Sequence, residues 1–355
     1  MRVTTASLAR LFQAARPENW WFSKIPPLLG VAYLEILKIG GESGPAVLLL
    51  GCYLFSISNV AAYGHVINDL FDIEADLRAG RHNTMAAAGG NRRLFLFLCA
   101  MLFLIGFAPT LLAHYSIPTI LLLALNFLWP TLYSLPGIRL KERGLAGLLC
   151  DALGSHVTPT LVVLSVFGMI WPARSSLFFP IVVVTWSAAL GLKGILHHQM
   201  LDRANDIRSG TVTFATAKLR PERMSRFMTF FNLFVELPVS AALVFATWGW
   251  APSVAIAFVI YGALETAKYS LGFQFALTSE TWTIRRSVPF TNETFYTVWL
   301  PLAAVVQLAA RGTVGLLIAV AHVLLFFPNI AAQFNEIKAI VRVADLPNRL
   351  VQWLR

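Results

Sequence analysis

The chain has 355 residues, of which 57% are hydrophobic and 13% charged, and its mean hydropathy is +0.66. This composition is far too apolar for a soluble globular domain and excludes the soluble classes of protein. The 28 Lys and Arg residues outnumber the 18 Asp and Glu residues, which gives a net charge of +10. Basic loops at a membrane face account for this excess, so we expect membrane lipids and no nucleic acid among the partners.

The first segment, residues 1–21, is predicted to be amphipathic. It carries Arg2, Arg10 and Arg16 and has no acidic residue before Pro17, a pattern that suits a helix lying on an anionic lipid surface. A transit peptide has a similar composition and is the alternative. No cleavable secretory signal is expected, because the first apolar run begins only after Pro17 and no small-residue cleavage site follows it.

Apolar runs recur along most of the chain, and at roughly 20 residues each they can cross a hydrocarbon core of about 30 Å as helices. They lie at about residues 22–40, 46–67, 94–114, 116–133, 146–169, 176–197, 226–248, 251–268, 295–310 and 313–331. We therefore expect an all-α integral membrane protein with nine or ten transmembrane helices. It is expected to be one domain over residues 1–355, with a C-terminal extension from about residue 270. Residues 270–294 are either a cap over the polar face or a solvated loop.

Basic residues gather in alternate loops of this predicted bundle. Those loops carry Arg78, Arg81, Arg92 and Arg93, then Arg139, Lys141 and Arg143, then Arg203, Arg208, Lys218, Arg220, Arg223 and Arg226. The opposite loops contain only Arg174 as a basic residue. The positive-inside rule places the basic loops on the cytoplasmic face, which we expect to be that of a bacterial inner membrane. The basic tail after Glu336 favours ten spans, and nine remains an alternative.

The second apolar run leads into an acidic motif made of Asn68, Asp69, Asp72 and Asp76. If the helix continues, Asp69, Asp72 and Asp76 lie at i, i+3 and i+7, and Asn68, Asp72 and Asp76 at i, i+4 and i+8. Like charges so close together destabilise a bare helix, so a bound cation is expected. Oxygen ligands without clustered Cys or His favour Mg²⁺, which usually completes its shell with phosphate oxygens.

A second acidic motif follows the sixth run, with Asp202 and Asp206 at i and i+4. Two such motifs at one membrane face could hold magnesium ions and clamp a diphosphate, with nearby arginines on its outer oxygens. The alternative is that both motifs are ordinary solvated ends of spans. Their matching positions favour a functional site, because acids at a membrane are costly.

These motifs resemble those of the UbiA superfamily of intramembrane prenyltransferases. The family motif NDxxDxxxD matches at Asn68 to Asp76, and DxxxD matches at Asp202 to Asp206. The stretch from Tyr133 to Arg143 is similar to the family's YSxPPxRLKxR loop, and Arg16-Pro17 before the first span is also typical of the family. The resemblance covers about residues 16–270.

The resemblance implies a helical bundle, usually of nine spans, around a central cavity that opens sideways to lipid beneath a polar cap. It implies that the cap holds Mg²⁺ and diphosphate. The implied metal ligands are Asn68, Asp69, Asp72, Asp76, Asp202 and Asp206. The implied diphosphate partners are Arg81, Arg139, Lys141 and Arg208, and the candidate catalytic residues are Asp72, Asp202, Asp206 and His198.

The chain departs from the family pattern at two places near these motifs. Many members have a basic residue and then Asn-Arg-Pro after the first motif, whereas this chain has Thr84 and Met85 after Asn83. Enzymes with aromatic acceptors often have tyrosine four residues before the second motif, where this chain has His198. The family's acceptors are therefore not transferred to this chain.

The expected function is Mg²⁺-dependent transfer of a prenyl group from an allylic polyprenyl diphosphate to an unidentified aromatic or lipid acceptor, with release of diphosphate. His197 or His198, just before the second motif, could orient the acceptor or take its proton, or could be structural. The alternatives are an intramembrane terpene cyclase and transfer of phosphoribose to a lipid phosphate. A transporter is disfavoured, because the acids lie at span ends and not near the midplane.

Overall fold

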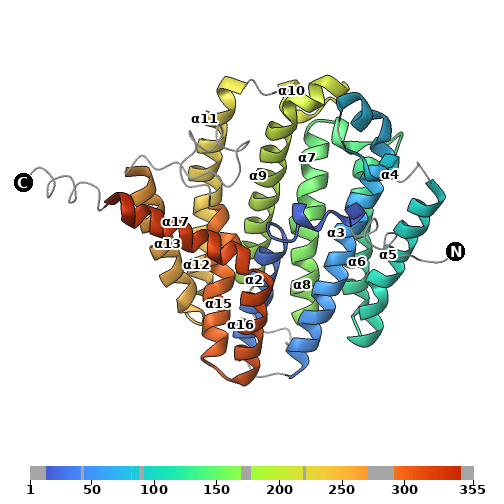
Figure 1. Ribbon diagram of the computed structural model, residues 1–355. Coiled ribbons are helices and arrows are strands. Elements are labelled where there is room, and N and C mark those ends of the chain that lie inside the picture. Colours follow the sequence, from blue (N-terminus) through green and yellow to red (C-terminus); the bar gives the residue numbers. More distant parts are fainter. Residues whose placement is uncertain are drawn as a thin grey trace, which may run out of the picture.

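The structure is a computed structural model that describes residues 13–40, 44–80, 82–87, 92–168, 177–218, 221–270 and 292–344. Within these ranges every regular element is a helix (Figure 1). Residues 1–12 of the predicted amphipathic segment, Arg81, and most of the 270–294 segment lie outside the described residues.

The first half of the chain supplies the helices that carry both acidic motifs. In chain order these are η1 Pro17–Asn19, α2 Ile25–Ile39, α3 Gly44–Ala79, α4 Thr84–Ala87, α5 Arg92–Leu112, α6 Ile117–Ser134, η2 Leu140–Glu142, α7 Leu145–Ala152, η3 Leu153–Val157, α8 Thr158–Gly168 and α9 Phe178–Ser209. Local signals explain several of the ends. Ser116 accepts a bond from the Thr119 amide at the start of α6, and Gly40 and Gly210 end α2 and α9 at φ values of 100° and 75°.

The second half packs beside the first. It comprises α10 Phe214–Lys218, α11 Pro221–Phe231, η4 Asn232–Glu236, α12 Leu237–Thr247, α13 Pro252–Ser270, η5 Phe295–Trp299, α15 Leu300–Ala309, α16 Thr313–Leu325 and α17 Phe327–Ala344. The elements η3, η4 and η5 are π turns within longer helices. A bend of 75° separates α16 from α17. This bend divides the predicted run at 313–331.

Six helices in the described part of the chain are long and apolar enough to cross a membrane, or seven if the bent pair α16 and α17 counts as one span. They are α3, α5, α6, the continuous helix from α7 to α8, α9, and the helix over Arg226–Thr247. The chain is therefore an integral membrane protein, as its composition predicts. The count of nine or ten spans stays a prediction, since short helices such as α2, with 15 residues, fall below the length of a full span.

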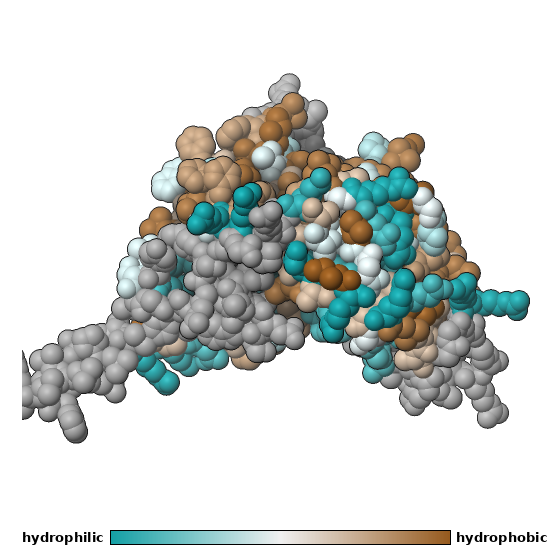
Figure 2. Space-filling model, turned by 90° about the horizontal axis from the view of Figure 1, so that it is seen from above, coloured by the Kyte–Doolittle hydropathy of each residue, from teal (hydrophilic) through white to brown (hydrophobic). Residues whose placement is uncertain are grey.

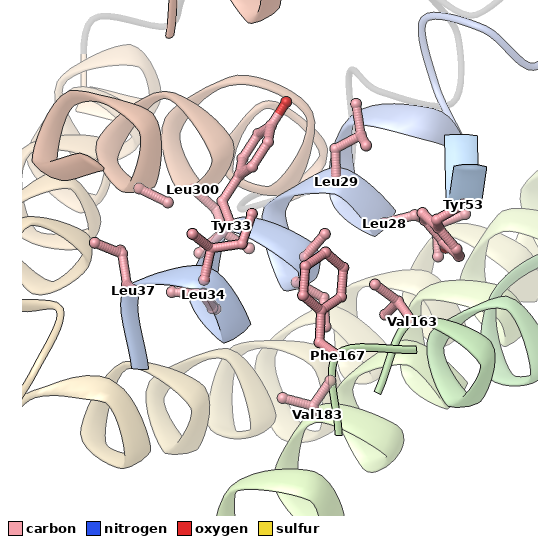
Figure 3. Close-up of a cluster of buried hydrophobic side chains, with 14 of the residues drawn as sticks. Leu28, Leu29, Tyr33, Leu34, Leu37, Tyr53, Val163, Phe167, Val183 and Leu300 are labelled. Carbon is pink, nitrogen blue, oxygen red and sulfur yellow. The ribbon is translucent and has the colours of Figure 1, made fainter. Parts of the chain in front are cut away.

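Helix α2 lies inside the bundle. Nearly all of its residues are buried, and it packs against α8 and α15. Figure 3 shows Leu29 and Leu34 of α2 with Phe167 of α8, Val183 of α9 and Leu300 of α15 in one apolar cluster. Within a membrane such side chains stabilise the fold by close van der Waals packing. This cluster joins the two halves of the bundle.

Helices α3 and α9 are longer than a membrane requires. With 36 and 32 residues they extend about 54 and 48 Å at 1.5 Å per residue, against a hydrocarbon core of about 30 Å. Both acidic motifs lie in the last turns of these helices. The prediction that the first motif continues the second span as a helix is confirmed, because α3 runs without a break to Ala79.

Close packing at Gly191 fixes the position of α9. A Cβ atom at this residue would lie 2.8 Å from the Ala152 Cα atom and 3.0 Å from its carbonyl oxygen, where α7 ends. We therefore expect Gly191→Ala to destabilise the purified protein by about 1–3 kcal/mol in thermal unfolding. Gly194→Ala is the matched control on the same helix, because nothing lies within 4 Å of its Cβ position. Equal stability of the two variants would contradict this packing.

Candidate functional site

Polar side chains gather at one end of the bundle, where α3 and α9 end. Figure 2 shows this face, with hydrophilic residues clustered among apolar ones. A cavity of about 100 Å³ lies here between the two acidic motifs, and we call it the motif cavity. It is lined by Asn68, Asp72, Ala75, Asp76, Tyr133, Arg139, Lys141, His198, Gln199, Asp202, Asp206, Ser209, Thr211 and Thr213. Two motifs more than a hundred residues apart therefore face a single cavity.

Asp72 of the first motif pairs with two cations. The Arg139 Nη2 atom donates to its Oδ1 at 3.1 Å, and the Lys141 ammonium donates to its Oδ2. Lys141 also donates to the Asn68 Oδ1 atom at 3.3 Å, and Ser134 donates to the same oxygen at 3.1 Å. The loop between α6 and α7 thus supplies two cations, Arg139 and Lys141, to the first motif. Both also line the cavity that the second motif faces.

Burial acts on the pKa values of Arg139 and Lys141, which lie outside the membrane-spanning helices. Burial lowers the pKa of the Lys141 ammonium, and the Asp72 carboxylate opposes this effect. Burial acts in the same direction on Arg139, but its bonds to Glu142 and Asp72 outweigh it and raise the pKa of the guanidinium. The pKa of Arg139 is therefore raised and that of Lys141 lowered, although both cations pair with Asp72.

Asp69 is directed away from the motif cavity, although it belongs to the same motif. Its carboxylate forms an ion pair with Arg16 at 2.8 Å and accepts a bond from the Thr84 amide at 3.2 Å. Asn83 donates to the Asp69 backbone oxygen at 3.0 Å and to the Asp76 Oδ2 at 2.8 Å. Asp69 and Asn83 thus connect the end of α3 to the segment before α2 and to the loop after α3.

The second motif faces the cavity from the end of α9. His198 Nε2 lies 3.3 Å from Asp202 Oδ2, and the histidine side chain is 68% exposed. Thr213 donates to Asp206 Oδ2 at 3.3 Å. The chain can turn back to place Thr213 here because α9 ends at Gly210, whose φ of 75° suits the left-handed conformation. The exposed imidazole and the two carboxylates therefore lie side by side at the cavity.

Eight of the predicted site residues line the motif cavity, namely Asn68, Asp72, Asp76, Arg139, Lys141, His198, Asp202 and Asp206. Two others that the structure describes do not. Asp69 binds Arg16, and Arg208 donates to Asn205 on its own helix. Arg81 lies outside the described residues. The roles of all of these residues remain predictions.

The motif cavity is also lined by four residues that the motifs did not predict, namely Tyr133, Gln199, Thr211 and Thr213. Tyr133 begins the stretch to Arg143 that resembles the family's loop, and Gln199 directly follows His198. Their positions next to the recognised motifs could therefore have indicated that both residues lie at the site. No spacing rule indicates Thr211 and Thr213, because they reach the cavity only through the turn at Gly210.

The ligand types at the motif cavity fit a hard divalent cation. Carboxylate and amide oxygens from both motifs line it, and no cysteine does. Within the described ranges, however, no group of three or more His, Cys, Asp and Glu side chains is close enough to form a metal site. The residue types of the lining are thus those that bind Mg²⁺, although their spacing in the described part of the chain does not form a metal site.

The chain is similar to known prenyltransferases and to a protein of carotenoid biosynthesis. The pattern of the UbiA prenyltransferase family matches residues 26–271. A curated relative from Dietzia sp. (strain CQ4), the C(50) beta-cyclic carotenoids biosynthesis protein LbtBC, is 27% identical over 214 residues. The match covers 58% of this chain and 46% of that protein, so the chain spans about half the length of the relative.

Solved structures of a UbiA homologue from Archaeoglobus fulgidus share the fold. The form bound to DMAPP and Mg²⁺ has a TM-score of 0.53 at 18% identity, covering 89% of this chain and 99% of that one. The form bound to GPP and Mg²⁺ has a TM-score of 0.55 at 17% identity, covering 84% and 99%. At such identities the likeness establishes the fold alone.

Proposed function

The chain belongs to the UbiA prenyltransferase family, and from this we propose that it transfers a prenyl group from an allylic prenyl diphosphate to a lipophilic acceptor, with release of diphosphate. The observation that carries the proposal is the single cavity lined by Asp72 and Asp76 from α3 and by Asp202 and Asp206 from α9. Carboxylates at such a site would bind a divalent cation, and the cation would in turn bind the oxygens of a diphosphate.

The donor's diphosphate head is proposed to occupy the motif cavity. Asn68, Asp72, Asp76, Asp202 and Asp206 would hold Mg²⁺, which when bound supplies positive charge to the leaving diphosphate. Arg139 and Lys141 would donate hydrogen bonds to the diphosphate oxygens as negative charge builds on them. At about 100 Å³ the cavity has room for a head group, so the isoprenoid chain would lie beyond it among the helices.

His198 is proposed to accept the proton that the product loses after the new bond forms. Its Nε2 atom lies 3.3 Å from the Asp202 carboxylate, and the ring is exposed at the cavity. Histidine is the side chain that most often serves as a general base, and the contact with Asp202 orients the ring at the cavity. Water must be kept from the allylic cation, and Asp72, Asp206 and Gln199 form a buried part of the lining, although His198 is exposed.

We propose an isoprenoid hydrocarbon of the carotenoid class as the acceptor. The name of the Dietzia relative supports this choice. An aromatic acceptor, cyclisation of the donor and transfer of phosphoribose to a lipid phosphate are the competing reactions. We also propose that the whole chain is one prenyltransferase domain, and that the motif cavity lies on the cytoplasmic face because the basic loops share its end of the bundle.

An assay of the purified protein with radiolabelled prenyl diphosphates tests these proposals. We expect a prenylated carotenoid product only when Mg²⁺ and the acceptor are both present, and loss of product on addition of EDTA. Allylic diphosphates of several chain lengths, 4-hydroxybenzoate and a lycopene suspension are the substrates to compare. Diphosphate release without acceptor would favour cyclisation, and turnover in EDTA would contradict the magnesium proposal.

A further inference from the structure

A second, larger cavity of about 710 Å³ lies beside the motif cavity and has no part in the proposed reaction. It is bordered by the last turns of α3, the first turns of α5, the loop over residues 136–142 and the end of α9. Three arginines line it, Arg78, Arg92 and Arg139, and we call it the arginine cavity. We propose that it is a second binding site, specific for a phosphate or diphosphate group.

The charge of the arginine cavity suits an anion. Its three arginines face only two carboxylates, those of Glu74 and Glu142, so the lining is net positive. Glu142 forms an ion pair with Arg139, with 2.5 Å between the Glu142 Oε1 and the Arg139 Nε atoms. Arg78 and Arg92 are exposed, and among the described residues neither forms an ion pair with a carboxylate. Planar guanidinium groups of this kind bind phosphate oxygens in pairs.

One wall of the arginine cavity is apolar. Leu70, Phe71 and Ile73 of α3 and Leu96 of α5 line it, and Leu96 is 55% exposed. The neighbouring Phe97 on α5 is exposed as well, as expected for a helix that faces lipid. Arginines beside an apolar wall at the end of a membrane helix can hold a phosphate group on a lipid, and equally a free one.

The arginine cavity adjoins the motif cavity, and the two share Ala75, Arg139, Ser209 and Thr211 in their linings. The Arg139 guanidinium stands in the shared wall, because it bonds Asp72 on the motif side and Glu142 on the other. Arg139 itself has the left-handed φ of 42°, a conformation rare for residues with a side chain. A diphosphate released from the motif cavity would meet this guanidinium first and the arginine cavity next.

Two sources could supply the phosphate group. One is the diphosphate released by the reaction, and this reading rests on the proposed function. The other is the headgroup of an anionic membrane lipid, which does not depend on that function. The chemistry of the site is the same in both cases, since guanidinium groups would bind phosphate oxygens without a metal ion.

Binding of radiolabelled inorganic pyrophosphate to the full-length protein in phosphatidylcholine nanodiscs tests the proposal. The buffer contains EDTA, so that metal-dependent binding in the motif cavity is suppressed. We expect saturable binding to the wild-type protein and a loss of affinity of at least about tenfold in the Arg78→Gln/Arg92→Gln variant. Arg93→Gln is the matched control, because Arg93 is exposed next to Arg92 but lines neither cavity.

Nanodiscs that also contain phosphatidylglycerol separate the two sources. Weaker pyrophosphate binding in these discs would identify a lipid headgroup as the occupant, and unchanged binding would identify the free diphosphate. Absence of saturable pyrophosphate binding to the wild-type protein, or equal binding by the double variant and the Arg93→Gln control, would overturn the site. Because no turnover is involved, pyrophosphate binding without prenyl transfer would contradict only the proposed function.

Discussion

Asp202→Asn is expected to lower Mg²⁺-dependent prenyl transfer by at least about a hundredfold while leaving the protein folded. The amide keeps the shape of the side chain but removes the negative charge that a divalent cation requires. The Asp202 side chain lines the motif cavity and is 29% exposed, so the fold is expected to tolerate an amide of the same shape. Product formation from labelled prenyl diphosphate, at several Mg²⁺ concentrations, is the measurement.

Asp72→Asn is expected to reduce transfer as strongly, but with some loss of stability, because Asp72 pairs with the buried Lys141. Glu18→Gln provides the control, since it makes the same chemical change at an exposed position outside both cavities. Normal turnover in both aspartate variants would remove the assignment of the site.

Glu236→Ala is expected to lower the free energy of unfolding by about 3–5 kcal/mol, a large fraction of the stability of most proteins. The Glu236 side chain is fully buried, and both of its oxygens lie 2.9 Å from the Lys193 ammonium. Asn292 donates to the same carboxylate at 3.4 Å. Without Glu236, the buried Lys193 ammonium would lose the carboxylate that compensates its charge.

The double variant Lys193→Met/Glu236→Leu is the control for this prediction. Replacing a whole buried ion pair by apolar side chains is often neutral or stabilising, so the double variant is expected to recover most of the lost stability. Unfolding in a detergent series, followed by tryptophan fluorescence, compares the three proteins. Equal losses in the single and double variants would mean that the two charges are not coupled.

The sequence predicted the helical class, and with it the extension of α3 through the first motif, because apolar runs and helical spacing are local properties. The sequence could not show whether the side chain of Asn68 or that of Asp69 lies with Asp72 and Asp76 at the cavity, because both residues fit a helical register. The structure places Asn68 at the cavity and Asp69 against Arg16, which is 53 residues away. Such a contact depends on how helices pack, and local spacing carries no information about it.

Packing also explains the other features that the sequence did not predict. Lys193 lies within an apolar run and gives no sign that its partner is Glu236, which is 43 residues further along. The motif cavity, in turn, includes Thr211 and Thr213 only because the chain reverses at Gly210. The sequence indicated which residue types the site needs, and the tertiary fold selected among them.

The ion pair between Arg16 and Asp69 bears on how the sequences of relatives should vary. The pair ties the segment before α2 to the end of α3 and does not face the motif cavity. Loss of one charge would leave the other buried or half-buried without a partner, so natural selection is expected to keep or replace the two together. Across relatives, positions 16 and 69 are expected to be kept or replaced together, whereas position 72 is expected to stay aspartate whatever residue stands at position 16.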